Sequence, residues 1–453
     1  MANARATFTE GSVARHILVM SSTSALSLLA VFLVDILTLV YVSMLHVPLL
    51  LAAVGVAKIP VFLNSAIGTG FTIAAATVLS ERIGHKASKM FARLTANLMV
   101  MIVIASGLTA GLQLALVTPI THWLGADSST YEAARGFIWL TLPFSVLQSA
   151  MQMTAQILRT MGDSRRALWV VLSGAATLAV ADPFLIFVMD LGLTGAGLAY
   201  ALSACVSLGV GLYEIRRRTG LILPTHLKLL GLHTRRTLRI ALPAIVANLA
   251  TPVGLAYLVS TIATYGVSVL AAMAVLDRVM QLSYGAYFAL PGALAPVLGQ
   301  NIGARLDDRV RSAIIFSRRL IVTYGLAIWV VLLLVAVPIA NLYELEGAGR
   351  ELFLAFCRFG GGLWAIIGLD FMAIAVLVTM GRAWLVPVFA WLRTTLGTVP
   401  FVLVGVHFFG GSGALLGAFT GNALIAVTSI SFAALIAKRF FDRRAQPVIA
   451  DTQ

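Results

Sequence analysis

Hydrophobic residues in this chain gather into long runs that are separated by short polar turns. Twelve runs are long enough to cross about 30 Å of hydrocarbon, which an α-helix does in roughly 20 residues. Several runs exceed that length, so tilted helices or helix ends that project past the bilayer are expected. The twelve predicted spans are residues 17–45, 50–80, 94–120, 134–158, 166–189, 194–215, 238–264, 268–300, 314–341, 351–380, 384–408 and 413–437.

The composition supports the same interpretation. The 453 residues are 60% hydrophobic and only 11% charged, whereas soluble proteins carry about 25% charged residues. The chain is therefore predicted to be an all-α integral membrane protein. The first run lacks a small-residue cleavage site, so we interpret it as the first helix and not as a signal peptide. Cys205 and Cys357 lie far apart in apolar runs without metal-ligand spacing, and they are expected to be packing residues.

The positive charge is distributed in a way that predicts the orientation in the membrane. Of the 32 lysines and arginines, 27 fall in turns on one side of the predicted spans, and the exceptions are Lys58, Arg135, Arg278, Arg350 and Arg358. Basic residues mark the cytoplasmic side of membrane proteins. Both termini are thus predicted to be cytoplasmic, in the plasma (cytoplasmic) membrane. No basic stripe with interleaved aromatic residues is present, so no nucleic-acid partner is predicted.

The sequence also contains an internal repeat. Two pairs of short motifs are 219 positions apart and a third pair is 218 apart, each at equivalent spans. The pairs are SERIG (80–84) with GQNIG (299–303), TMG (160–162) with TMG (379–381), and TGA (194–196) with SGA (412–414). We therefore predict two parallel six-helix lobes, residues 1–220 and residues 221–453. Such lobes, related by an axis along the membrane normal, enclose a central cavity in many transporters.

Four acidic residues lie inside the predicted spans: Asp35, Asp182, Asp277 and Asp370. A carboxylate within the bilayer costs several kcal/mol unless it is hydrated, protonated or paired, so each one is a functional hypothesis. Asp35 and Asp182 lie at similar depths in helices that both run outward, and Pro183 follows Asp182 directly. Two carboxylates that face one cavity tend to share a proton. This pair is the predicted ion-coupling site, although hydrogen bonds to nearby Ser or Thr would give it a structural role.

The other two acids give weaker hypotheses. Asp277 is followed by Arg278, and an interfacial or interhelical salt bridge explains it as well as a binding role does. Asp370 follows a glycine-rich stretch in the tenth span, where it either lines the cavity of the second lobe or has a structural role. No HExxH, CxxC, P-loop or GxSxG motif occurs. Neither an enzyme nor a cofactor or metal site is predicted, and any transport must draw on an ion gradient.

Several motifs resemble those of the multidrug and toxic compound extrusion (MATE) family over nearly the whole chain. RTMGDSRRALWV, ADPFLIF and LGLTGAGLA are similar to the family's LRAxGD turn, its LDP in helix five and its GxxGAAxAT in helix six. The helix-one acid, the SERIGHKASK turn and GQNIGARLDD resemble the family as well. The resemblance implies export of bulky, often cationic amphipathic molecules by alternating access, coupled to a cation.

Two departures from the family pattern bear on the coupling ion. The family commonly places Asn four residues before the helix-five Asp, where this chain has Leu178, and Thr in the helix-six motif, where it has Tyr200. The predicted span 238–264 contains no acid, unlike that of Na⁺-coupled relatives. A Na⁺ site needs several oxygen ligands, so H⁺ is the favoured coupling ion and Na⁺ the alternative. Tyr200 joins the four acids as a candidate site residue.

Other functions remain open at this stage. A flippase for a lipid-linked sugar or another lipid belongs to the same broader superfamily, but the spans hold four acids against one clear arginine, Arg278, which favours a cationic substrate. A carrier of the major facilitator type shares the parallel six-helix halves without these motifs. A channel needs neither a twofold repeat nor a buried acid pair.

Overall fold

The computed structural model describes residues 6–85, 88–119, 128–219 and 227–445, and all regular elements in these ranges are helices. The first half contains η1 (Thr7–Thr9), α1 (Val13–Ser43), α2 (Pro48–Gly84), α3 (Ser88–Ala115), α5 (Ser128–Thr160), α6 (Ser164–Pro183), the π-helical turn η2 (Phe184–Val188) and α7 (Gly192–Thr219). The second half contains α8 (Leu227–Ala263), α9 (Val267–Gly303), α10 (Asp307–Leu342), α11 (Gly347–Ala355), the π-helical turn η3 (Phe356–Gly360), α12 (Gly361–Thr379), α13 (Leu385–Thr394) and α14 (Val399–Ala445).

The helices agree with the predicted spans. The described residues contain 10 helical stretches that are long and apolar enough to cross a membrane. One of them, Leu385–Ala445, is 61 residues long and folds back on itself at Gly410, so it supplies two spans. The 33-residue helix α5, which carries charged residues in its first turns, supplies another. Within the described part of the chain, the fold is thus an all-α membrane fold that accommodates all twelve predicted spans.

Glycines explain the reversal inside α14. Gly410 has φ 60° and ψ −139°, a conformation that L-residues with a Cβ rarely adopt. The segments on either side of it pack backbone to backbone. A Cβ on Gly413 would lie 1.9 Å from the carbonyl oxygen of Gly405, and one on Gly417 would lie 2.1 Å from that of Phe401. Small residues that allow such close approach are typical of helix pairs in membranes.

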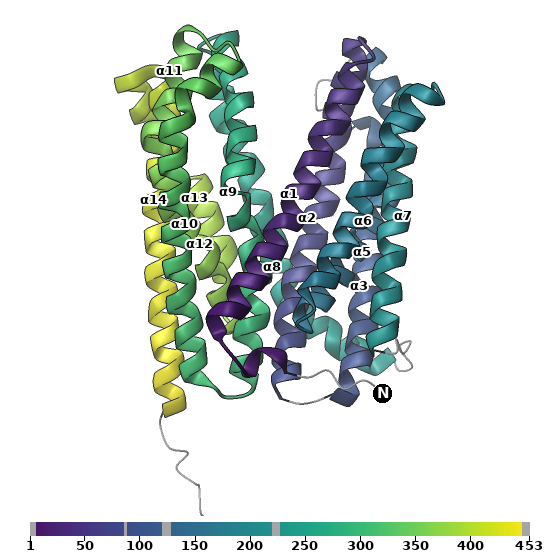
Figure 1. Cartoon of the computed structure of the whole chain (residues 1–453), viewed down its shortest axis with the longest axis vertical. Helices are drawn as coiled ribbons and strands as arrows, with labels where there is room; N and C mark the ends of the chain where they lie inside the picture. Colours follow the sequence, from purple (N-terminus) through teal and green to yellow (C-terminus); the bar gives the residue numbers. More distant parts are fainter. Residues whose placement is uncertain (1–5, 86–87, 120–127, 220–226, 446–453) are drawn as a thin grey trace, which may run out of the picture.

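The helices form two bundles that meet at one end of the molecule. Figure 1 shows α2, α3, α5, α6 and α7 on one side and α9 to α14 on the other. The bundles converge at the end where η1 lies, the η1 end, and diverge towards the end where α11 lies, the α11 end. Helix α1 crosses between them and contacts both α9 and α6. Phe8, Ile17 and Met20 pack into the hydrophobic core of the second half.

The repeated motifs contact each other across the seam between the bundles. A Cβ on Gly84, at the end of α2, would lie 2.3 Å from the carbonyl oxygen of Gln300 in α9. A Cβ on Gly303, at the end of α9, would lie 2.4 Å from the carbonyl oxygen of Glu81 in α2. The two copies of the sequence repeat are therefore symmetric partners in one contact. The predicted lobe boundary between residues 220 and 221 falls outside the described residues.

Candidate functional site

Asp182 is the most buried of the predicted site residues. It lies next to last in α6, is 0% exposed, and accepts a hydrogen bond on Oδ2 from the hydroxyl of Thr38 in α1. Its Oδ1 is buried and has no hydrogen-bond partner among the described residues. Pro183 lacks an N–H, and the helix continues as a π-helical turn. Such turns often occur at functional sites.

Asp35 lies one turn before Thr38 on α1 and is exposed. It acts electrostatically on Asp182 and on the half-buried phenol of Tyr200 in α7. The structure thus brings together Asp35, Asp182 and Tyr200, three of the five predicted site residues. Thr38, on the same helix as Asp35, donates its hydroxyl to the Asp182 carboxylate. A hydroxyl donor beside two carboxyl groups is an arrangement that can hold one exchangeable proton.

Asp35 and two cations, Lys58 and Arg278, form what is here called the charged group. Lys58 of α2 and Arg278 of α9 both interact electrostatically with Asp35, and Arg278 belongs to the other bundle. Asp35 precedes the α11 end of α1 by eight residues, whereas Lys58 and Arg278 follow the starts of their helices by 10 and 11 residues. At 1.5 Å per residue all three lie about 12–17 Å from that end. The charged group therefore occupies one level of the molecule.

Asp277 has a partner on its own helix. Gln281, one turn further along α9, donates a hydrogen bond of 2.7 Å to Asp277 Oδ2. The adjacent Arg278 acts electrostatically on Asp277 and also on Asp35 of α1. Asp277 therefore lies beside the charged group, held by a local hydrogen bond.

Asp370 has a different environment. In the second half, its Oδ2 forms a salt bridge of 2.6 Å with Arg393 Nη1, which joins α12 to α13. The two side chains are 6% and 18% exposed, so this is a buried pair. Trp391 and Thr394 bind carbonyl oxygens of α8 and fix α13 in place. Arg393 was assigned to the cytoplasmic side from the sequence, but it lies in the last turn of α13 with its side chain largely buried.

Sequence reasoning missed Lys58 and Thr38. Lys58 lies nine residues into a predicted span, and an intramembrane lysine is itself a functional signal. The sequence-based charge balance set four acids against Arg278 alone, whereas the structure adds Lys58 to the charged group and assigns Arg393 to Asp370. Thr38 was detectable from its position one turn after Asp35. The hydrogen bond to Asp182 was not, because it depends on how α1 packs against α6.

The arrangement of the helices is that of a multi-pass membrane transporter. The MatE family model matches residues 24–209 and 243–404. This chain belongs to the MatE family, whose members are transporters and not enzymes. The fold is also that of a variant of the Vibrio cholerae MATE transporter VcmN, with a TM-score of 0.89, 20% identity, and coverage of 95% of this chain and 97% of that one.

Two relatives were found by sequence. The chain is 40% identical over 227 residues to an uncharacterized 21 kDa protein in the iaaL 5′ region of Pseudomonas savastanoi, which covers 50% of this chain and 75% of that protein. It is 25% identical over 291 residues to an FAD transporter of Shewanella oneidensis, which covers 62% of this chain and 64% of that protein. The second match spans just under two thirds of the relative's length.

Proposed function

We propose that this protein is a proton-coupled exporter of bulky amphipathic small molecules in the cytoplasmic membrane. Asp35 and Asp182 are its coupling residues. The observation that carries the proposal is the Asp182 carboxyl, which is buried with one oxygen unpartnered while the other accepts the hydroxyl of Thr38. A carboxyl group in that position is stable in the membrane when it holds a proton.

Asp370, the buried acid of the second half, differs from Asp182 in its partner. Asp370 already has a cation, Arg393, at 2.6 Å, so an incoming ion would have to displace a buried guanidinium. Breaking such a pair typically costs about 3–5 kcal/mol. This contrast supports ion coupling at Asp182 and not at Asp370.

The oxygen atoms around Asp182 favour H⁺ over Na⁺. The side chain one turn before it on α6 is Leu178, which offers no ligand, and Tyr200 is the only further oxygen-bearing side chain that the family pattern points to. A single proton needs one carboxyl oxygen, whereas a metal cation needs several ligands. Proton binding from the outside would lower the affinity for a cationic substrate, and proton release to the inside would restore that affinity.

We also propose that the η1 end faces the cytoplasm and the α11 end faces outward. The described arginines at the η1 end, such as Arg82, Arg236 and Arg305, fit the excess of positive charge on cytoplasmic loops. The divergence of the bundles towards the α11 end then corresponds to an outward-open state (Figure 1). In that state Asp35, which is exposed, is reached by protons from outside.

Two classes of substrate are candidates: a cation and a molecule with an anionic group. The family resemblance and the acids Asp35 and Asp182 favour a cation. Lys58 and Arg278, one from each half, favour a molecule with an anionic group, and the relative from Shewanella oneidensis is named an FAD transporter. Lys58→Gln separates the two, because removing one positive charge should raise the efflux of a cationic dye and lower that of FAD, when each is measured separately.

The coupling proposal is tested in everted membrane vesicles loaded with a proton gradient. We expect uptake of a fluorescent cationic dye that an uncoupler abolishes and that replacement of Na⁺ leaves unchanged. Asp35→Asn and Asp182→Asn should each lower the rate at least tenfold at equal protein level. Asp190→Asn is the matched control, because Asp190 is exposed and has φ 53°, a conformation that Asn tolerates.

Normal export by both variants would contradict the assignment of Asp35 and Asp182. Export that follows Na⁺ and ignores the uncoupler would contradict proton coupling. A wild type that moves neither the dye nor FAD would favour the lipid flippase.

A further inference from the structure

Residues 6–11 lie across the seam between the two halves. Residues 6–11, here called the latch, include the short helix η1 and lead into α1 at Val13. They lie at the η1 end, where the two bundles converge (Figure 1). Phe8, in the middle of the latch, is 2% exposed and packs its ring edge-on to His16, with ring centroids 5.3 Å apart.

The latch is bound firmly to the second half. The backbone N–H of Phe8 donates to Gln300 Oε1 at 2.9 Å, and the Phe8 carbonyl accepts from Asn301 Nδ2 at 3.1 Å. Arg309 of α10 donates to the carbonyls of Phe8, Glu10 and Gly11 at 2.9, 3.2 and 2.9 Å. One guanidinium thus binds three carbonyl groups, and it is itself oriented by Asn301 Oδ1 at 3.0 Å.

The same latch is bound to the first half. The hydroxyl of Thr7 donates to the carbonyl of Met161, at the end of α5, at 3.2 Å. A Cβ on Gly162 would lie 2.8 Å from Thr7 Cβ, so the turn after α5 is in close contact with the latch. Gln300 spans the seam as well, because its Nε2 donates to the carbonyl of Thr160 at 2.8 Å.

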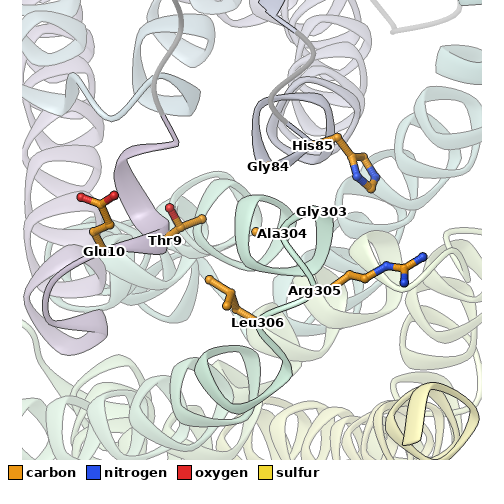
Figure 2. A pocket seen from close by; sticks show the side chains of 8 residues that line it. All are labelled: Thr9, Glu10, Gly84, His85, Gly303, Ala304, Arg305 and Leu306. Carbon is orange, nitrogen blue, oxygen red and sulfur yellow. The ribbon is translucent and has the colours of Figure 1, made fainter. Parts of the chain in front are cut away.

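A cavity of about 550 Å³ lies beside these contacts. Figure 2 shows Thr9 and Glu10 of the latch on one side of Ala304, with His85 and Arg305 on the other. The lining therefore comes from the latch, the end of α2 and the end of α9. Without the latch contacts, the η1 end would be held by the glycine contacts of α2 and α9 and by the contacts of α8 with α2 and α3, which include the Arg236–Glu81 salt bridge.

We propose that the latch holds the η1 end closed, and that Arg309, Gln300 and Asn301 are positioning residues that set the balance between the two facing states. The proposal rests on alternating access, which is part of the proposed function. Because Gln300 and the latch bind α5 and α9 at once, the halves cannot separate at this end without breaking those hydrogen bonds. Loss of any of these hydrogen bonds therefore favours the state that is open at the η1 end, and loss of those to the charged Arg309 does so most.

The test measures conformation and not transport. Spin labels on Val47→Cys and Val267→Cys report the distance between the halves at the α11 end, and labels on His85→Cys and Asp308→Cys report it at the η1 end. The background carries Cys205→Ser and Cys357→Ser. We expect Arg309→Ala to shift the population ratio at least tenfold towards a state that is wider at the η1 end and narrower at the α11 end.

Two further variants make the result specific. Gln300→Leu keeps the volume of the side chain but loses its bonds to Phe8 and Thr160, and it should shift the ratio in the same direction. Arg311→Ala is the control, because Arg311 also lies on α10 but stacks on Phe441 at 4.6 Å instead of binding the latch. It should leave both distances unchanged.

The proposal is overturned if Arg309→Ala and Gln300→Leu are folded in detergent and give the wild-type distances. It is also overturned if Arg311→Ala shifts them equally. These outcomes are independent of proton coupling, because the distances do not require a substrate. Wild-type distances in the latch variants together with loss of dye efflux in Asp35→Asn would reject the latch and keep the proposed function.

Discussion

The two halves of this transporter each bury an aspartate but surround it differently. Asp182 in the first half meets a hydroxyl and leaves one oxygen unpartnered among the described residues. Asp370 in the second half also leaves one oxygen unpartnered among the described residues, but its other oxygen meets a guanidinium at 2.6 Å. Asp182 therefore has a neutral donor as its partner, whereas Asp370 has a cation. The chemistry of the partner thus separates a candidate coupling residue from a structural one.

The largest effect is expected from breaking the pair in the second half. Arg393→Met leaves the Asp370 carboxylate buried without its counter-ion, which should cost about 3–5 kcal/mol of stability. The melting temperature of the purified protein in detergent measures this loss. The double variant Asp370→Leu with Arg393→Met should recover most of it, because an apolar pair removes both buried charges.

A coupling role for Asp370 would produce another pattern. The double variant would then be stable but would fail to export dye. Export within about twofold of the wild type would support the structural assignment. Asp182→Asn supplies the comparison, since it should be stable and inactive.

A smaller effect, on transport, is expected from removing the Thr38 hydroxyl, the neutral donor of the first half. Thr38→Val replaces the hydroxyl by a methyl group of similar size and leaves the Asp182 carboxyl without its only hydrogen bond from a described residue. A hydrogen bond to a charged group contributes about 1.5–3 kcal/mol, so proton-driven efflux should fall about tenfold or more. Thr38→Ser keeps the donor and should retain most of the activity. Equal rates for Val and Ser would show that the bond plays no part in transport.

The smallest effect would sharpen the choice of ion. Leu178→Asn together with Tyr200→Thr restores the two oxygen-bearing side chains that the MATE pattern has at these positions. Each new ligand contributes on the scale of one hydrogen bond, about 0.5–1.5 kcal/mol. Efflux by the double variant should therefore gain a Na⁺ stimulation of about threefold, measured by replacing Na⁺ with choline. Stimulation of the wild type to the same extent would contradict proton coupling.

The sequence predicted most of the fold because membrane spans depend on local hydrophobicity. The twelve runs and the repeat of SERIG as GQNIG correspond to helices and to one symmetric contact. It also singled out Asp35 and Asp182, since acids in apolar runs stand out. It did not assign Arg393 to Asp370, because Arg393 was counted with the cytoplasmic basic residues and the pairing depends on how α13 packs against α12. Thr38 was missed because its role depends on the packing of α1 on α6.

The latch has a consequence for how the protein is made. Phe8 is synthesised well before its partners Gln300 and Asn301, which come 292 and 293 residues later. Contacts between such distant positions form late, because the intervening chain must be synthesised and placed first. The latch therefore has no binding partner in α9 while α1 to α8 enter the membrane. The η1 end closes only after α9 has been synthesised and inserted.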